Sequence, residues 1–160
     1  MKTGKTALKF KTAAISIIIA LAVGGLSAFL TRGSMAQYEA AAKPALAPPP
    51  TVFPIVWTAL FILMGLSAAL VYDSGSKDSG RALTVYAVQL AVNFVWPLIF
   101  FGAGKYLFAF FWLILLFALV LLMAVNFRRI KPLSAYLQIP YMLWLIFAGY
   151  LNFAVWSLNR

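Results

Sequence analysis

The sequence predicts an all-α integral membrane protein, a single domain built as a bundle of five transmembrane helices. Hydrophobic residues make up 64% of its 160 residues and charged residues only 10%, whereas an ordinary soluble domain has roughly 45–50% and 25%. The few charged residues are also unevenly spaced, so that they separate five uncharged stretches. A helix needs about 20 apolar residues to cross a bilayer, and each stretch is long enough for one span.

The first expected helix covers residues 13–30. The lysines before it, from Lys2 to Lys11, resemble the basic start of a secretory signal peptide. The apolar run is longer than the 7–15 residues typical of such peptides, so we expect it to remain as a membrane helix. Ala20, Gly24 and Ala28 are small residues spaced four apart. This spacing favours close helix packing, either within one chain or between two.

A long loop is expected over residues 31–51. Connections longer than about 12–15 residues are uncommon in compact proteins and tend to be functional or disordered. Residues 34–42 are expected to form a short helix, and Pro48, Pro49 and Pro50 stiffen the chain before it returns to the membrane. The loop is therefore either a lid over a cavity or a simple connector.

The other four helices are expected at residues 53–72, 82–101, 106–127 and 135–158, joined by short loops. Pro54 falls in the first turn of its helix, where its missing N–H costs nothing. Pro97 lies inside the third span and Pro140 early in the fifth. A proline inside a helix removes a hydrogen bond, so we expect a kink at each.

The distribution of Lys and Arg predicts the orientation. With the N-terminus inside, the ends and loops on the inner side hold nine basic residues and those on the outer side hold four. Basic residues favour the cytoplasmic side. We therefore expect a multi-pass protein of the cell membrane with a cytoplasmic N-terminus and an external C-terminus. The net charge of +10 then reflects this topology, and no nucleic-acid partner is expected.

The residues that the chain lacks exclude most catalytic sites. It has no His and no Cys, and its acidic residues are Glu39, Asp73 and Asp78. Without His and Cys, and with so few carboxylates, the chain has no usual general base, no thiolate nucleophile and no usual metal-ligand set. We expect no metal site and no required cofactor, so any function must depend on aromatic rings, amides and shape.

Three of the expected helices carry a stripe that mixes Trp with aromatic, amide or small residues. Residues three or four apart share one face of a helix. The stripes are Phe53, Trp57 and Phe61; Gln89, Asn93 and Trp96; and Trp144, Ala148 and Asn152. Such stripes fit plain helix packing, and they equally fit an aromatic-lined pocket for a flat, conjugated ligand. Spacing alone leaves both interpretations open.

Longer motifs resemble one known family. They are Pro48-Pro49 followed by Val52-Phe53-Pro54-Ile55-Val56-Trp57-Thr58 and Met64-Gly65; Gln89-Leu90, Asn93, Trp96-Pro97 and Phe100-Phe101-Gly102; and Pro140-Tyr141, Trp144, Phe147-Ala148 and Leu151-Asn152. In this order and spacing they resemble the TspO/MBR family of tryptophan-rich sensory proteins. Its animal members are the translocator protein, or peripheral benzodiazepine receptor. The resemblance covers nearly the whole chain from Gly24 onward.

The resemblance implies a five-helix bundle, often a homodimer, that binds porphyrins such as protoporphyrin IX and haem in a cavity under the first loop. It implies a role as sensor, scavenger or regulator. Some bacterial members are linked to light- and oxygen-dependent breakdown of protoporphyrin, which would make Trp57 and Trp144 catalytic; facilitated porphyrin transport is a third reading. The ligand-binding residues carried over by motif or placed beside it are Phe53, Trp57, Phe61, Asn93, Trp96, Trp144, Ala148 and Leu151.

The chain departs from the family pattern in two regions. Leu46 and Thr51 stand where the family often has aromatic residues in the first loop, which affects the loop's expected contribution to ligand contact. Phe153 and Ser157 replace the tyrosine and the basic residue of the cholesterol motif of animal members. Sterol binding is therefore not expected.

Overall fold

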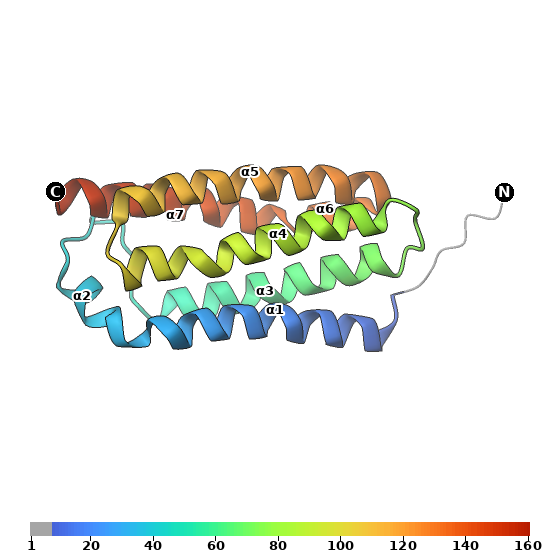
Figure 1. Ribbon diagram of the computed structural model, residues 1–160, viewed down its shortest axis with the longest axis horizontal. Helices are drawn as coiled ribbons and strands as arrows, with labels where there is room; N and C mark the ends of the chain where they lie inside the picture. The colour runs from blue at the N-terminus through green and yellow to red at the C-terminus, as the bar shows by residue number, and fades with distance from the viewer. Residues whose placement is uncertain (1–7) are drawn as a thin grey trace.

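Five long helices lie along one another in the computed structural model, which describes residues 8–160 (Figure 1). They are α1 (Phe10–Thr31), α3 (Val52–Tyr72), α4 (Ser79–Pro97), α5 (Tyr106–Ile130) and α7 (Ile139–Leu158). Four short helical segments complete the described chain: η1 (Arg32–Ser34), α2 (Met35–Ala40), the π-helical η2 (Leu98–Gly102) and α6 (Pro132–Tyr136). All five long helices have the length and apolar composition to cross a membrane. The expected all-α bundle of five transmembrane helices is confirmed.

The order of packing places α1 beside α3 and α4, and α5 beside α4 and α7. In Figure 1, α2 and its loop lie at the same end of the bundle as the C-terminus. Large apolar side chains cover the outside of the bundle; Ile18, Phe111 and Leu143 are 64%, 59% and 63% exposed. Lipid tails would cover these side chains in a bilayer, where helices satisfy their own backbone hydrogen bonds. The orientation stays a prediction, and Lys2 and Lys5 lie outside the described residues.

Two helices have bounds that differ from those expected: α5 is longer than its expected span, and the fifth span is divided in two. α5 continues through Arg128 and Arg129. Charged residues mark where a span leaves the membrane, but they do not end the helix. The fifth span is divided: α6 ends at Tyr136 and α7 begins at Ile139. Pro140 therefore lies in the first turn of α7, where a backbone N–H has no partner in the helix. The expected helix of residues 135–158 is thus interrupted at residues 137–138, directly before Pro140, and the proline lies in the first turn of a new helix where a kinked helix was expected.

Pro97 does distort its helix. Regular α-helix ends at this residue, and the π-helical η2 follows it. The wider winding shows in the hydrogen bond from the Ala103 N–H to the Leu98 carbonyl, at 2.9 Å. Such π-helical turns are rare and often occur at functional sites. Here the turn carries Phe100 and Phe101 toward the loop that contains α2.

Small residues bring α1 and α3 together. Ala20 is fully buried, and Gly24 faces the Phe61 ring so closely that an added Cβ would lie 2.2 Å from its Cε2 atom. On the other side, a Cβ on Gly65 would lie 2.5 Å from the Ile17 Cα. The small-residue stripe of the first helix is therefore used within the chain. A homodimer stays an expectation from the family resemblance.

Asp73 joins the end of α3 to the start of α1. Its carboxylate accepts hydrogen bonds from the Lys9 backbone N–H at 2.7 Å and from the Thr12 hydroxyl at 3.1 Å. The side chain is buried, with 7% exposed. A carboxylate at a helix N-terminus satisfies free N–H groups and complements the helix dipole, so Asp73 fixes the start of α1 on the end of α3.

Candidate ligand pocket

A cavity of about 320 Å³ lies between α1, α3 and α4 at the end of the bundle that carries the long loop. Its volume is at the lower end of the range for small-molecule pockets, about 300–1,000 Å³. The lining is mostly apolar and aromatic, with a few polar side chains. Five residues expected from the sequence line it: Phe53, Trp57, Phe61, Asn93 and Trp96.

The α3 wall of the pocket is a pair of aromatic rings one helical turn apart. The Trp57 and Phe61 rings have centroids 5.7 Å apart and planes inclined by 32°. Trp57 also meets Tyr141 edge-on, with centroids at 6.1 Å. No described residue accepts a hydrogen bond from the Trp57 indole N–H. This wall therefore offers a broad aromatic surface to a ligand.

A buried hydrogen-bond network holds Asn93 on the α4 wall. Its amide Nδ2 donates to the Tyr141 hydroxyl at 2.5 Å, and that hydroxyl donates to Gln89 Oε1 at 3.1 Å. Gln89 and Tyr141 are fully buried. Buried polar groups of this kind are costly unless each is paired. The network therefore fixes how α4 and α7 are rotated relative to the pocket.

Trp96 is held by a second link to α7. Its indole Nε1 donates to Asn152 Oδ1 at 3.2 Å, and Asn152 Nδ2 donates to the Tyr106 carbonyl at 2.6 Å. The Trp96 ring stacks on Phe100, with centroids 5.0 Å apart and planes inclined by 20°. One face of the indole is thus used in packing and its orientation is fixed. Asn152 supports the pocket from outside it.

The long loop covers the pocket and is held at two points. Tyr38 in α2 packs on Phe100 and Phe101, with centroids at 5.6 and 5.1 Å, and is only 7% exposed. The Ala42 backbone N–H and carbonyl each form a 2.9 Å hydrogen bond with the Asn159 side chain. Since Met35, Tyr38 and Pro50 also line the cavity, the loop acts as a lid. Of the two sequence interpretations, the structure favours the lid.

Three expected site residues lie elsewhere. Trp144 lines a separate groove of about 510 Å³ between α3 and α7, and its ring meets Phe53 edge-on at 5.9 Å. Ala148 and Leu151 are each 6% exposed and line none of the described cavities. The ligand contacts of these three residues stay predictions that depend on the family resemblance.

Sequence reasoning missed other residues of the pocket. Tyr38 stands in a loop whose position no periodicity could give, and Arg32 follows the end of a helix. Phe101 belongs to a family motif, but the site assignment did not include it. Leu46 and Thr51, the departures in the first loop, do not line this pocket. The loop instead covers the pocket with the aromatic ring of Tyr38.

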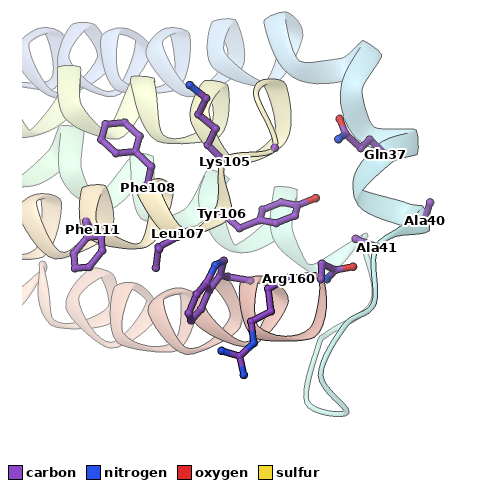
Figure 2. A pocket seen from close by; sticks show the side chains of 12 residues that line it. Gln37, Ala40, Ala41, Lys105, Tyr106, Leu107, Phe108, Phe111 and Arg160 are labelled. Carbon is purple, nitrogen blue, oxygen red and sulfur yellow. The ribbon is translucent and has the colours of Figure 1, made fainter.

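A wider cleft of about 850 Å³ lies at the same end of the bundle, between α2, the start of α5 and the C-terminus (Figure 2). Tyr106 extends toward α2 in it, while Lys105 and Arg160 point away from each other (Figure 2). The Arg160 guanidinium lies 5.5 Å from the Trp156 ring centre. The cleft therefore lacks the converging groups that the lidded pocket has.

The fold and the pocket define a class: a small multi-pass membrane protein in which a loop covers an aromatic cavity between helices. The TspO/MBR family model matches residues 16–157, and the chain belongs to this family.

Three relatives show how far the similarity extends. The tryptophan-rich protein TspO of Chlorobaculum tepidum is 36% identical over 151 residues, which cover 92% of this chain and 96% of the relative. Protein CrtK of Rhodobacter capsulatus is 36% identical over 148 residues, covering 91% of each. The translocator protein of Homo sapiens is 35% identical over 137 residues, covering 84% of this chain and 81% of its own. The similarity thus spans nearly the whole chain in bacterial and animal relatives.

The packing of Tyr38 predicts the effect of opening the lid. Replacing Tyr38 with alanine removes a buried ring, and we expect amide hydrogen exchange in residues 35–42 to rise at least tenfold (about 1.4 kcal/mol or more). Hydrogen exchange followed by mass spectrometry measures this change. Tyr38→Phe keeps the ring and should exchange like the unmodified protein. Equal exchange in all three proteins would show that Tyr38 does not hold the lid.

Proposed function

We propose that this protein binds a flat, conjugated tetrapyrrole such as protoporphyrin IX in the lidded pocket and acts as a sensor or regulator in the membrane. The observation that carries this proposal is the aromatic lining. Trp57 and Phe61 form one wall, and Trp96 is held on the next helix by a hydrogen bond to Asn152. Flat conjugated rings stack well against such surfaces, and the apolar lining suits a ligand that partitions into lipid.

The family supports the role. Relatives carry names such as tryptophan-rich sensory protein, from Cereibacter sphaeroides, and translocator protein, from Ovis aries. These names fit a sensory or regulatory function in a membrane. A cavity of about 320 Å³ is small for a whole macrocycle, so in this proposal one edge of the ring enters between the helices and the lid moves to admit the remainder.

The choice between metal-free porphyrin and haem follows from the side chains. Haem iron takes axial ligands such as His, Cys, Met or Tyr. This chain has no His and no Cys, and of the other two types the pocket lining holds Met35 and Tyr38. The Tyr38 ring is packed against Phe100 and Phe101, so in this proposal the flat ring of the porphyrin, and not its iron, supplies most of the binding. We expect metal-free protoporphyrin IX to bind at least as tightly as haem.

A titration in the dark tests the proposal. Purified protein in detergent is titrated with protoporphyrin IX and, separately, with haem, and the Trp fluorescence and the porphyrin absorbance are recorded together. Saturable binding of protoporphyrin supports the proposal, with haem binding equally or more weakly. Absence of saturable binding would overturn it. Much tighter haem binding, with a shift of its main absorbance band, would show iron ligation and overturn the expected preference.

The same sample placed in light distinguishes binding from breakdown. Trp57 lines the pocket, and an indole beside a bound porphyrin is suited to one-electron photochemistry with oxygen. Loss of porphyrin absorbance only with protein, light and oxygen together, and slower in Trp57→Phe, would support the enzymatic alternative. Equal loss of porphyrin absorbance with and without protein would exclude the enzymatic alternative, and binding would remain as the proposed function. Porphyrin uptake into liposomes containing the protein would support transport.

A further inference from the structure

One charged residue lines the pocket. Among the described residues that form its wall, Arg32 alone carries a charge. It follows the last residue of α1 and begins η1, so it lies at the mouth of the pocket on the side where the helices leave the apolar region. A ligand that enters from this end passes its guanidinium.

The surroundings of Arg32 hold the guanidinium without neutralising it. Its Cζ atom lies 3.9 Å from the centre of the Phe29 ring, a cation–π contact that orients the charge and leaves its edge free to donate. No carboxylate in the described part of the chain forms an ion pair with it. Arg32 is exposed, so its guanidinium is free to meet an anion at the rim of the pocket, where a hydrogen bond between two charged groups is stronger than one between neutral groups.

The neighbouring hydroxyl groups of the pocket are already used. The Ser27 hydroxyl donates to the Phe94 carbonyl at 2.9 Å, and the Thr31 hydroxyl donates to the Ser27 carbonyl at 3.0 Å. Arg32, in contrast, offers a planar set of donors that matches the two oxygens of a carboxylate. The strongest free hydrogen-bonding group of the pocket is therefore an arginine.

We propose that Arg32 binds a carboxylate of the ligand, so that the pocket selects flat, apolar acids over their neutral analogues. This inference depends on the proposed function and makes it more specific. The ring of the ligand lies among the aromatic side chains, and its acid group lies at the mouth of the pocket beside Phe29. Arg32 determines specificity, while the aromatic walls supply most of the contact.

Comparing an acid with its ester tests this role. Protoporphyrin IX and its dimethyl ester share the same ring, but only the acid carries carboxylates. Both are titrated in the dark, by porphyrin absorbance, into the unmodified protein, Arg32→Gln, Arg32→Lys and Lys105→Gln. We expect the unmodified protein to prefer the acid by about tenfold or more, as a charged hydrogen bond allows. Arg32→Gln should lose this preference by weakening acid binding alone, and Arg32→Lys should keep part of it.

The control removes an equal charge at the same end of the bundle. Lys105 lines the wider cleft, so Lys105→Gln should keep the preference for the acid. Equal affinities for acid and ester in the unmodified protein, or the same preference in Arg32→Gln, would overturn the inference while the porphyrin pocket stands. If Lys105→Gln lost the preference and Arg32→Gln kept it, the inference would be overturned, because the acid group would then lie in the wider cleft. Absence of saturable binding of either compound would overturn both proposals.

Discussion

Replacing Trp57 with alanine is expected to weaken protoporphyrin binding at least tenfold. The indole forms much of the α3 wall, and its loss removes both a stacking partner and buried apolar area. An aromatic pair contributes about 0.5–1.5 kcal/mol beyond the area that it buries, and the buried area itself adds about 25 cal/mol per Å². The dissociation constant is measured by porphyrin absorbance, because the substitution also changes the protein's fluorescence.

Two other tryptophans provide the controls. Trp156 lines the wider cleft, so Trp156→Ala should bind like the unmodified protein. Trp144 does not line the pocket but meets Phe53, which does, so Trp144→Ala should weaken binding less than Trp57→Ala does. A larger loss in Trp144→Ala would place the ligand at the groove between α3 and α7. A loss confined to Trp156→Ala would place it in the wider cleft.

Replacing Gly65 with alanine should lower the free energy of unfolding by about 2–3 kcal/mol. The new Cβ would lie 2.5 Å from the Ile17 Cα and 2.7 Å from its backbone nitrogen. Backbone atoms cannot turn aside as a side chain can, so α1 and α3 must separate. Inserting one carbon into a close contact typically costs about 1–3 kcal/mol, and a contact with backbone belongs at the upper end. Helical circular dichroism during heating or titration with denaturant measures the change.

Gly25 offers a matched glycine on α1. A Cβ there would meet no atom within 4 Å, and alanine is a better helix former than glycine by about 1 kcal/mol. Gly25→Ala should therefore be as stable as the unmodified protein or slightly more so. Equal free energies of unfolding for Gly65→Ala and Gly25→Ala would contradict the close approach of α1 to α3.

The sequence predicted the spans well because a bilayer imposes a length on each helix and excludes charge from it. It could not give helix ends outside the membrane, since no such constraint acts there. The stripe on α3 led directly to Phe53, Trp57 and Phe61, because helical periodicity places them on one face. That face lines the cavity from Phe53 to Phe61.

Periodicity does not give the rotation of a whole helix about its axis. Trp144 lies on a clear stripe, but the hydrogen bonds of Tyr141 and Asn152 turn α7 so that Trp144 meets the groove beside α3. Gln89 and Asn93 share a face, yet only Asn93 lines the pocket; Gln89 is buried against Tyr141. Such choices depend on contacts between distant segments, which a local pattern does not contain.

The two hydrogen bonds between Ala42 and Asn159 bear on biogenesis. During synthesis Ala42 of the lid leaves the ribosome 117 residues before its anchor, Asn159. Asn152, which positions Trp96, also belongs to the final helix. A partly inserted chain with only its first four spans in the membrane therefore has neither a fastened lid nor a fixed α4 wall. In the proposed function, capture of the tetrapyrrole must therefore wait until α7 is inserted, and a chain still being synthesised would not hold the ligand.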